Sequence, residues 1–313
     1  MKDKILLIGG GFIGSNFLNY FSDNLNDSQY EIVVLSRSIQ PIQSKCNYIR
    51  YVEGSYLDVE LLNKLFEKER FTKVFHFASN IVPASSNQNK IGDLEDNLIA
   101  SIRLMEVMKT YNCNFIVYLS SGGAVYGEFE HEKLSEEHPC LPISSYGIIK
   151  LTIEQYIKLY HKQSGLKYLI LRLSNPYGPF HKSNEQGVVN IAIRKALKSE
   201  LFKVWGNGTQ SKDYIYVEDI IEIIFSLLNS GIQNETINVG SGETISLNFI
   251  LTKIKELIPG FKVEYENSKP TDIMKFCLDT RILNQFVTVE LTPFEKGLSK
   301  TVEWEKANLN EFK

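Results

Sequence analysis

The first half of the chain alternates short apolar runs with longer segments in which apolar residues return every three or four positions. Continuous apolar runs of this length are typical of buried strands, whereas the longer spacing is typical of helices with one buried face. The apolar runs predict strands at residues 5–8, 31–35, 48–52, 73–77, 115–119 and 168–173. The spaced segments predict helices at residues 13–21, 58–68, 93–108 and 146–161.

This alternation favours one fold class. Strand–helix units joined by short connections build a Rossmann-like α/β fold, a doubly wound parallel sheet with helices on both faces. In such sheets ligands bind at the carboxyl ends of the strands. The residues that follow the predicted strands are therefore candidate site residues: the glycine turn at 9–14, Ser36-Arg37, Phe77-Ala78-Ser79, Ser120-Ser121 and Asn175-Pro176.

The glycine turn links the first predicted strand to the first predicted helix. Its sequence, GGGFIG at residues 9–14, has the form G-x-G-x-x-G. Gly9 allows the tight turn, Gly11 lets the backbone approach a phosphate, and Gly14 lets the helix pack closely on the strand. A strand, a glycine turn and a helix N-terminus in this order predict a site for the pyrophosphate of a dinucleotide cofactor.

A second candidate element is Tyr146, which precedes Lys150 by four residues. On a helix, residues four apart share a face. A lysine beside a tyrosine can lower the pKa of the phenol, so that the phenol accepts a proton near neutral pH. Another Tyr-x-x-x-Lys, from Tyr265 to Lys269, precedes Pro270 in a polar stretch and is predicted to be a turn.

The pattern changes after Pro176, where Gly178 and Pro179 interrupt the regular alternation. A helix is predicted near residues 188–198. We expect a dinucleotide-binding domain over residues 1–175 and a smaller α/β domain over residues 176–313. Segments of the smaller domain, about residues 212–232, return to the first domain. The substrate is expected in the cleft between the two domains.

Composition disfavours several classes of function. With 313 residues, 43% of them hydrophobic, the chain is long enough for a large core. The formal net charge of -3 comes from mixed signs, with no basic stripe for nucleic acid. The four cysteines lie far apart and the five histidines are scattered, so neither a disulfide framework nor a metal site is predicted. No apolar run reaches membrane-spanning length, and unpaired thiols suit the cytoplasm.

Several short blocks of sequence follow one another in a fixed order. They are GFIGS at 11–15, VFHFAS at 74–79, SSGGAVYG at 120–127, LRLSNPYGP at 171–179, WGNG at 205–208, KDYIYVED at 212–219 and NVGSG at 238–242. These blocks resemble the extended short-chain dehydrogenase/reductase family, and within it the nucleotide-sugar epimerase/dehydratase branch. The resemblance covers nearly the whole chain.

The resemblance implies an NAD-dependent enzyme with Tyr146 and Lys150 as catalytic residues, and Ser121 is the candidate for a third catalytic residue. It implies a set of cofactor-binding residues: Gly9, Gly11, Phe12, Ile13, Gly14, Ser36, Arg37, Phe77, Ala78, Ser79, Asn97, Tyr146 and Lys150. The partner is then a nucleoside-diphosphate sugar bound in the C-terminal domain. The candidate contacts with this substrate are Asn175, Val204, Lys212 and Lys269.

These substrate contacts have alternatives. Lys212 and Lys269 lie where the family commonly has arginines for the diphosphate, and each lysine would act as a point charge or remain a solvated surface charge. Asn175 binds the substrate or forms a turn. Val204 packs on the nucleotide base or fills the core.

Two departures from the family pattern concern the cofactor. The glycine turn is one residue shorter than the usual G-x-x-G-x-x-G, so its geometry can differ while pyrophosphate binding is retained. The second strand ends in Ser36-Arg37, with no acidic residue. A carboxylate there would accept hydrogen bonds from the ribose of NAD, whereas an arginine meets the 2′-phosphate of NADP or stacks on adenine. The residues favour NADP and the resemblance favours NAD.

Two further departures concern the chemistry. The serine or threonine that assists the tyrosine in the family aligns with Gly122, so Ser121 reaches the substrate only if the glycines bend the chain. The Asp-Glu pair of 4,6-dehydratases aligns with Gly123-Ala124. Because eliminating water needs acid and base groups, this replacement argues against a dehydratase.

The resulting functional prediction is oxidation at C4 of the sugar by a 4-epimerase in surface-polysaccharide precursor synthesis. A net C4 dehydrogenase or 4-keto reductase remains an alternative, because the usual assistant serine is missing. A catalytically inactive scaffold that binds dinucleotide is a third alternative, against which the retention of Tyr146 and Lys150 counts.

We also expect a homodimer or higher homo-oligomer, formed by the helices that begin near residues 93 and 146. Both helices carry apolar residues beyond a single stripe: Leu98, Ile102, Met105 and Met108 in one, Ile149, Ile153 and Ile157 in the other. A two-fold axis would make this surface self-complementary. The alternative is that these residues pack on the sheet of their own chain.

Overall fold

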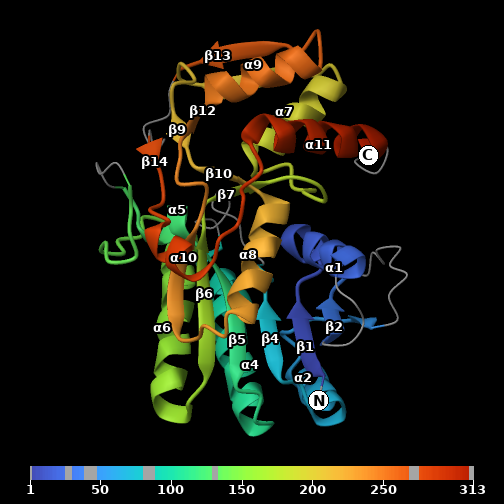
Figure 1. The fold of residues 1–313 in the computed structure, drawn as a ribbon, viewed down its shortest axis with the longest axis vertical. Coiled ribbons are helices and arrows are strands. Elements are labelled where there is room, and N and C mark those ends of the chain that lie inside the picture. The colour runs from blue at the N-terminus through green and yellow to red at the C-terminus, as the bar shows by residue number, and fades with distance from the viewer. Residues whose placement is uncertain are drawn as a thin grey trace.

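The structure is a computed structural model that describes residues 2–24, 30–38, 48–79, 89–128, 133–267 and 275–309. Within these ranges the largest feature is a parallel sheet with the strand order β11-β6-β5-β4-β1-β2-β3. Its strands are β1 (Asp3–Ile8), β2 (Tyr30–Ser36), β3 (Ile49–Glu53), β4 (Lys73–His76), β5 (Phe115–Ser121), β6 (Lys167–Leu173) and β11 (Glu235–Val239). The predicted doubly wound, Rossmann-like α/β fold is confirmed (Figure 1).

One strand of this sheet was not predicted. The strands expected from the apolar runs are all present, each within about two residues of its expected bounds. The additional strand, β11, pairs in parallel with β6 and brings a C-terminal segment to the edge of the sheet. Its buried run is short and contains the polar residue Asn238, so it lacks the apolar pattern that revealed the other strands.

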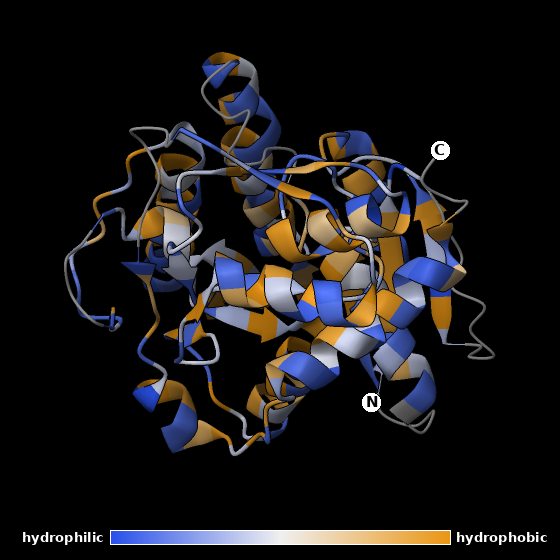
Figure 2. Cartoon of the chain, turned by 90° about the horizontal axis from the view of Figure 1, so that it is seen from above, coloured by the Kyte–Doolittle hydropathy of each residue, from blue (hydrophilic) through white to orange (hydrophobic). Residues whose placement is uncertain are grey.

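Helices cover both faces of the sheet, because alternate residues of a strand point to opposite sides. Leu6 and Ile8 of β1 pack with one group of helices: α2 (Val59–Glu69), α4 (Ala100–Thr110) and α6 (Ser145–Ser164). Ile5 and Leu7 pack with the other group: α1 (Phe12–Asn24), α8 (Val217–Asn229) and α10 (Arg281–Phe286). Figure 2 shows hydrophilic and hydrophobic residues together along the helices, as expected where one face is buried.

A separate hydrophobic cluster joins the C-terminal elements. These elements are α7 (Val188–Leu197), β8 (Phe202–Trp205), α9 (Leu247–Leu257), β13 (Val263–Glu266) and α11 (Phe294–Ala307). Figure 1 shows them gathered beyond the carboxyl ends of the large sheet. By contrast, α8 and β11 belong to the large sheet and its core. The division of the chain at residue 175 stays a prediction.

Short strands lie between these two groups of elements. They are β7 (Asn175–Tyr177) paired with β10 (Tyr214–Tyr216), and β9 (Ser211–Lys212) paired with β12 (Ile245–Ser246) and β14 (Lys275–Phe276). Across the parts of the chain that the structure describes, no helix is long and apolar enough to cross a membrane.

The helix predicted at residues 93–108 is irregular. It consists of α3 (Lys90–Asp93), a π-helical turn η1 (Leu94–Ile99) and α4. Within the π-helical turn Asn97 is buried, and its side-chain amide donates to the carbonyl oxygen of Asp93 at 2.9 Å. Single π-helical turns of this kind occur frequently at functional sites.

The apolar residues that we expected to form a dimer contact are used inside the chain instead. Those that are at most 3% exposed and pack on the sheet are Met105, Met108, Ile149, Ile153 and Ile157. Leu98 and Ile102 are partly buried against the same cluster. For the five buried residues the prediction of an intersubunit contact is therefore wrong, because each helix needs them to cover its own sheet. For Leu98 and Ile102 it stays a prediction. Other apolar side chains on the same helices are exposed: Ile91, Leu94, Ile99, Ile148 and Leu159.

Candidate functional site

The glycine turn lies between β1 and α1, at the carboxyl end of the sheet. Gly9 has a φ of +108°, and a β-carbon there would lie 2.7 Å from the backbone nitrogen of Ala78. A β-carbon on Gly14 would overlap the carbonyl oxygen of Gly9, so the helix approaches the strand this closely only with glycine. At Gly11, by contrast, no atom of the described residues lies within 4 Å of the position of a β-carbon. The space beside Gly11 is free for a ligand.

This free space borders the N-terminus of α1. The first backbone N–H groups of a helix have no carbonyl partner within it, and Phe12 and Ile13 supply two of them here. The helical bonds begin when Ser15 donates its N–H to the carbonyl oxygen of Gly11 at 2.7 Å. A helix N-terminus with open space beside a glycine accommodates phosphate groups. The residues present therefore fit the pyrophosphate of a dinucleotide.

The backbone that follows β4 lies directly beside the glycine turn. Phe77 and Ala78 both donate their N–H groups to the carbonyl oxygen of Ile8, at 2.9 and 2.8 Å. On the other side of β1 lies β2, which ends at Ser36 and is followed by the exposed Arg37. The cofactor residues predicted after three separate strands thus meet around one turn.

Tyr146 lies half-buried in the first turn of α6, and its side chain shares a hydrogen bond with Ser121. The helix begins here because the hydroxyl oxygen of Ser144 accepts the N–H of Gly147 at 3.1 Å. Ser121 is the last residue of β5, and the short helix α5 (Gly122–Val125) follows at once. The chain therefore bends at the glycines, and this bend brings Ser121 to Tyr146.

Lys150 lies one turn further along α6 and is 6% exposed. Its ammonium group donates to the carbonyl oxygen of Leu119 at 2.9 Å and lies 5.7 Å from the centre of the Tyr146 ring. Burial lowers the pKa of Lys150 to about 8, although the charge of Glu154 opposes this change. The lysine is therefore close to the point at which it loses its charge.

The expectation that Lys150 lowers the pKa of Tyr146 is not met in this structure. Burial raises the pKa of Tyr146 to about 12, and the group that opposes this rise is Ser121, through its hydrogen bond. Loss of water disfavours the charged phenolate, and a hydrogen bond to the oxygen favours it. Ser121 therefore acts more strongly on the phenol than we expected, and Lys150 acts less.

A narrow pocket beside Lys150 contains two more of the predicted cofactor residues, Ser79 and Asn97. His76 lines the same pocket and shares a hydrogen bond of 2.9 Å with Ser101, whose hydroxyl donates to the carbonyl oxygen of Asn97 at 2.6 Å. Burial lowers the pKa of His76 to about 3, so its ring is neutral. The π-helical turn is thus anchored to the sheet through His76.

The predicted substrate residues have different positions. Asn175 donates its side-chain amide to the carbonyl oxygen of Asp213 at 2.8 Å, and Lys212 is the neighbour of Asp213 in the chain, so Asn175 and Lys212 lie close together. Val204 is 1% exposed within the C-terminal cluster, so it fills the core and offers no surface to a nucleotide base. Lys269 lies outside the described residues.

Asp213 is an important residue that the sequence analysis missed. It is completely buried, and its carboxylate accepts the N–H and the hydroxyl of Ser241 at 2.8 and 2.9 Å, and the N–H groups of Gly242 and Leu278, each at 3.2 Å. A β-carbon on Gly240 would lie 2.5 Å from this carboxylate, which explains a glycine in the NVGSG block. The sequence offered one signal for this residue, which is a charged side chain at the start of an apolar run. If such a charge is buried with the run, it needs several hydrogen-bond partners.

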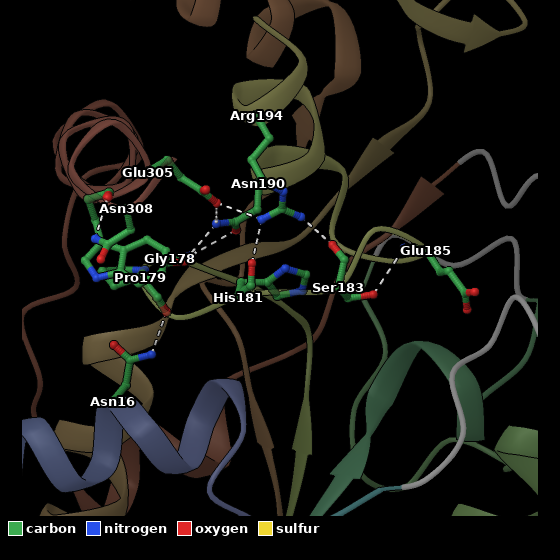
Figure 3. Close-up of polar contacts among 11 residues, drawn as sticks. Asn16, Gly178, Pro179, His181, Ser183, Glu185, Asn190, Arg194, Glu305 and Asn308 are labelled. Carbon is green, nitrogen blue, oxygen red and sulfur yellow. Dashed lines mark hydrogen bonds and ion pairs between the residues drawn. The ribbon is translucent and has the colours of Figure 1, made fainter. Parts of the chain in front are cut away.

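A buried polar network lies between the glycine turn and the C-terminal helices (Figure 3). Asn16 of α1 donates its side-chain amide to the carbonyl oxygen of Pro179 at 2.8 Å. The ring of His181 packs edge-on against Phe12, with 4.6 Å between the ring centres. The segment that follows β7 is therefore held against the first turn of α1.

The same segment is bound from its other side by α7 and α11 (Figure 3). Arg194 donates to the carbonyl oxygen of His181 at 2.6 Å and forms a buried ion pair with Glu305 at 2.8 Å. Asn190 donates to Glu305 at 2.9 Å and to the carbonyl oxygen of Gly178 at 2.8 Å. The C-terminal helices thus fix the position of the glycine turn through buried contacts.

Comparison with known sequences gives a family and several relatives. The model of the NAD dependent epimerase/dehydratase family matches residues 5–240. A protein of Methanocaldococcus jannaschii with the provisional name UDP-glucose 4-epimerase is 33% identical over 309 residues, covering 97% of this chain and 99% of the relative. A dTDP-4-dehydro-6-deoxyglucose reductase of Escherichia coli is 28% identical, covering 83% and 85%. A dTDP-glucose 4,6-dehydratase of Salmonella typhimurium is 26% identical, covering 97% and 93%.

Comparison with solved structures extends the likeness to the fold. The UDP-glucose 4-epimerase of Thermotoga maritima, solved with UDP-glucose, superimposes with a TM-score of 0.89 at 30% identity, covering 98% of this chain and 99% of that chain. The UDP-glucose 4-epimerase of Thermus thermophilus, solved with NAD, has a TM-score of 0.85 at 27% identity, covering 97% and 99%. The similarity includes both the large sheet and the C-terminal elements.

Proposed function

Because the chain belongs to the NAD-dependent epimerase/dehydratase family, we propose that it is a 4-epimerase of nucleoside-diphosphate sugars. The observation that carries the proposal is the grouping of Ser121, Tyr146 and Lys150 beside the residues that border the glycine turn. This grouping offers a proton acceptor next to a place for a dinucleotide. Relatives named UDP-glucose 4-epimerase support a UDP-sugar as the substrate. A role in surface-polysaccharide precursor synthesis in the cytoplasm is part of our proposal.

NAD is the cofactor of this family, and when bound it supplies the acceptor and donor of a hydride. In our proposal the three glycines of the turn and the first N–H groups of α1 bind the pyrophosphate. Ser36 and Arg37 border the adenosine ribose, where the missing carboxylate weakens discrimination against NADP. Phe77, Ala78, Ser79 and Asn97 line the cofactor between the turn and Lys150.

In our proposal the side chains of the protein transfer the proton. The phenol oxygen of Tyr146 takes the proton from the C4 hydroxyl of the sugar. It returns the proton to the C4 oxygen of the keto-sugar after the keto-sugar has rotated in the site. The hydroxyl of Ser121, already hydrogen-bonded to the phenol, shares the developing charge. Lys150 holds the cofactor ribose and adds positive charge nearby. Asn175, Lys212 and Lys269 are proposed to bind the nucleotide part of the substrate.

A net C4 dehydrogenase or 4-keto reductase is the second candidate function. It is favoured by the relative from Escherichia coli that is named a reductase. The two candidates differ in the state of the copurified cofactor. Firmly held oxidised NAD supports the epimerase, whereas copurified NADH, or an empty site with a preference for NADPH, supports net redox chemistry. An inactive scaffold would bind dinucleotide and convert no sugar.

We further propose that the enzyme is not a 4,6-dehydratase, although dehydratases are among its relatives. Gly123 and Ala124 are the two central residues of the four-residue helix α5 and carry neither an acid nor a base. The ring of Phe276 lies 3.7 Å from the position of a β-carbon on Gly123, so an apolar group borders this part of the site. Mass spectrometry that detects a 4-keto-6-deoxy product from a nucleotide sugar would overturn this assignment.

The experiment that tests the proposed function follows the C4 configuration by NMR during incubation with UDP-glucose and UDP-N-acetylglucosamine. We expect interconversion of the C4 epimers, and a loss of about 10²–10⁴-fold in Tyr146→Phe, because a general base contributes this much. The matched control is Tyr156→Phe on the same helix. Equal activity in the Tyr146 variant and the control would refute the role of Tyr146.

A further inference from the structure

A buried ion pair lies behind the helix that carries Tyr146 and Lys150. Glu154 of α6 is completely buried, and Arg172 of β6 is 3% exposed. The guanidinium group donates to the carboxylate through Nη2 at 2.7 Å and Nε at 3.1 Å, and the hydroxyl of Ser120 donates to the same carboxylate at 2.5 Å. These hydrogen bonds, of which those from Arg172 are charge-assisted, fix the position of the carboxylate.

This carboxylate is an anion whose charge acts on Lys150. Glu154 follows Lys150 by four residues, so both side chains point to the same side of α6, toward the sheet. Glu154 is the charged group whose field stabilises the ammonium form of Lys150. The other titratable groups around Lys150 come from β4, β5, the residues after β3 and α6 itself: His76, Tyr118, Tyr56 and Tyr146. None of these four carries a negative charge near neutral pH.

We propose that Glu154, held by Arg172, is a positioning residue that keeps Lys150 charged while Lys150 holds the cofactor ribose. The inference rests on the proposed function, because it takes Lys150 as the residue that binds the ribose. Lys150 needs such a partner because it is 6% exposed, and burial without a nearby anion favours the neutral amine. Glu154 in turn is held in position by the hydrogen bonds from Arg172.

The ion pair is also held by residues outside α6. Arg172 donates through Nη1 to the hydroxyl of Tyr126 at 3.0 Å, and that hydroxyl donates to the side chain of Asn238 in β11 at 2.8 Å. The amide of Asn238 donates in turn to the carbonyl oxygens of Leu134 and Asp279, at 2.8 and 3.2 Å. The position of the charge beside Lys150 is thus set by elements other than α6.

Removing the charge of Glu154 is expected to change the pH dependence of NAD binding in one direction. In the wild type, burial lowers the pKa of Lys150 to about 8 while Glu154 opposes the decrease. Removing the carboxylate charge lowers this pKa further, so the lysine becomes neutral at a lower pH. Affinity for NAD that depends on the charged lysine is then lost at a lower pH as well. An opposite charge at close range commonly shifts a pKa by about one unit or more.

The test is the pH dependence of NAD binding, measured by titration of the full chain across neutral and alkaline pH. Glu154→Gln removes the charge but leaves Arg172 unpaired, so this variant is less stable. The double variant Glu154→Met/Arg172→Met removes both charges and leaves apolar side chains in the core. The matched control is Tyr126→Phe, which loses a hydrogen bond to Arg172 and keeps the carboxylate.

In whichever charge-removing variant folds, we expect the alkaline midpoint of NAD binding to fall by about one pH unit. Glu154→Asp, which keeps the charge, is expected to recover part of this shift, and Tyr126→Phe is expected to keep the wild-type midpoint. An unchanged midpoint in a folded charge-removing variant overturns the inference, even when the wild type epimerises sugars. If the wild type shows this pH dependence of binding but converts no nucleotide sugar, the proposed function fails and the inference about Glu154 stands.

Discussion

At the scale of single residues, the site consists of groups whose charge depends on burial. Tyr146 loses water and holds its proton more tightly, whereas Lys150 loses water and holds its proton less tightly. The pKa values of the two groups are about 12 and about 8, so burial moves them apart from ordinary values of 10.0 and 10.5. The hydroxyl of Ser121 opposes the increase in the pKa of Tyr146, and the carboxylate of Glu154 opposes the decrease in the pKa of Lys150.

The first prediction concerns Ser121→Ala. The hydrogen bond from Ser121 lowers the pKa of Tyr146, so its loss raises that pKa. Less phenolate is then present at neutral pH, and the acidic limb of the pH profile of kcat/KM moves to higher pH. We expect about a tenfold loss at neutral pH, corresponding to about one hydrogen bond. Ser164→Ala, at the far end of α6, is the control, and an unshifted profile in Ser121→Ala would exclude this role.

A second residue-scale prediction separates binding from folding at the glycine turn. Gly11→Val places a side chain where no atom of the described residues lies nearby, so the chain should fold normally but lose NAD, because the valine occupies the space of the pyrophosphate. Gly14→Val would instead force the helix away from the strand, because its β-carbon meets the carbonyl oxygen of Gly9. Thermal melting and NAD titration of both variants check this. Unchanged NAD affinity in Gly11→Val contradicts our account of the turn.

Single residues were predictable from sequence where the backbone determines their position. The residues after β1, β2 and β4 meet around the glycine turn because parallel strands end at one edge. The contact of Ser121 with Tyr146 was not predictable, because it depends on the bend where α5 begins. Val204 was assigned to the substrate by resemblance, although its strand alternates buried and exposed positions and places it in the core. The positions of Ser121 and Val204 depend on the environment of each side chain, and the spacing of apolar residues alone does not predict that environment.

At the scale of elements, apolar patterns revealed strands that are continuous and buried and missed those that are short. The strand β11 has only a few buried residues, and one of them is Asn238. The π-helical turn before α4 has the same apolar spacing as a helix, so the sequence predicted one uninterrupted helix there. Its irregularity follows from tertiary contacts, namely the hydrogen bonds through which His76 and Ser101 hold the carbonyl oxygen of Asn97.

The third prediction concerns the ion pair that connects α7 with α11. Glu305→Gln removes the carboxylate charge that forms the buried ion pair with Arg194, so we expect a loss of about 3–5 kcal/mol in the free energy of unfolding. The double variant Arg194→Met/Glu305→Leu removes both charges and should recover much of this loss. Urea denaturation measures the difference. A single variant that unfolds like the wild type would show that the pair contributes nothing to stability.

At the scale of the whole molecule, buried polar contacts connect the C-terminal elements with the elements of the large sheet. The network around Arg194 and Glu305 reaches Phe12 in the glycine turn, and the network around Arg172 reaches Asn238 and the C-terminal segment. Both networks join residues that are far apart in the sequence. For this reason the sequence analysis contained Tyr126, Arg172 and Asn238 only as parts of separate blocks, and it did not single out Arg194 or Glu305.

The fourth prediction is a homodimer, which we propose on the exposed apolar residues of α3, η1 and α6. Ile148→Asp should give a folded monomer, because this side chain is 51% exposed on α6. Ile153→Asp should unfold the chain instead, because Ile153 is buried against the sheet. Light scattering at micromolar concentration reports the mass of each variant. A monomeric wild type would refute the dimer, and a dimeric Ile148→Asp would move the interface elsewhere.

The fifth prediction concerns the fate of the hydrogen on C4, which tests the central claim most directly. A UDP-sugar labelled with deuterium at C4 is incubated with the purified enzyme, and the products are analysed by mass spectrometry and NMR. A 4-epimerase removes the deuteride from C4 and returns it to the other face of the same carbon, so we predict inverted product that retains deuterium at C4. Tyr146→Phe should give almost no product. A keto-sugar that accumulates with deuterium transferred to the cofactor, or unchanged sugar with wild-type enzyme, would contradict the account.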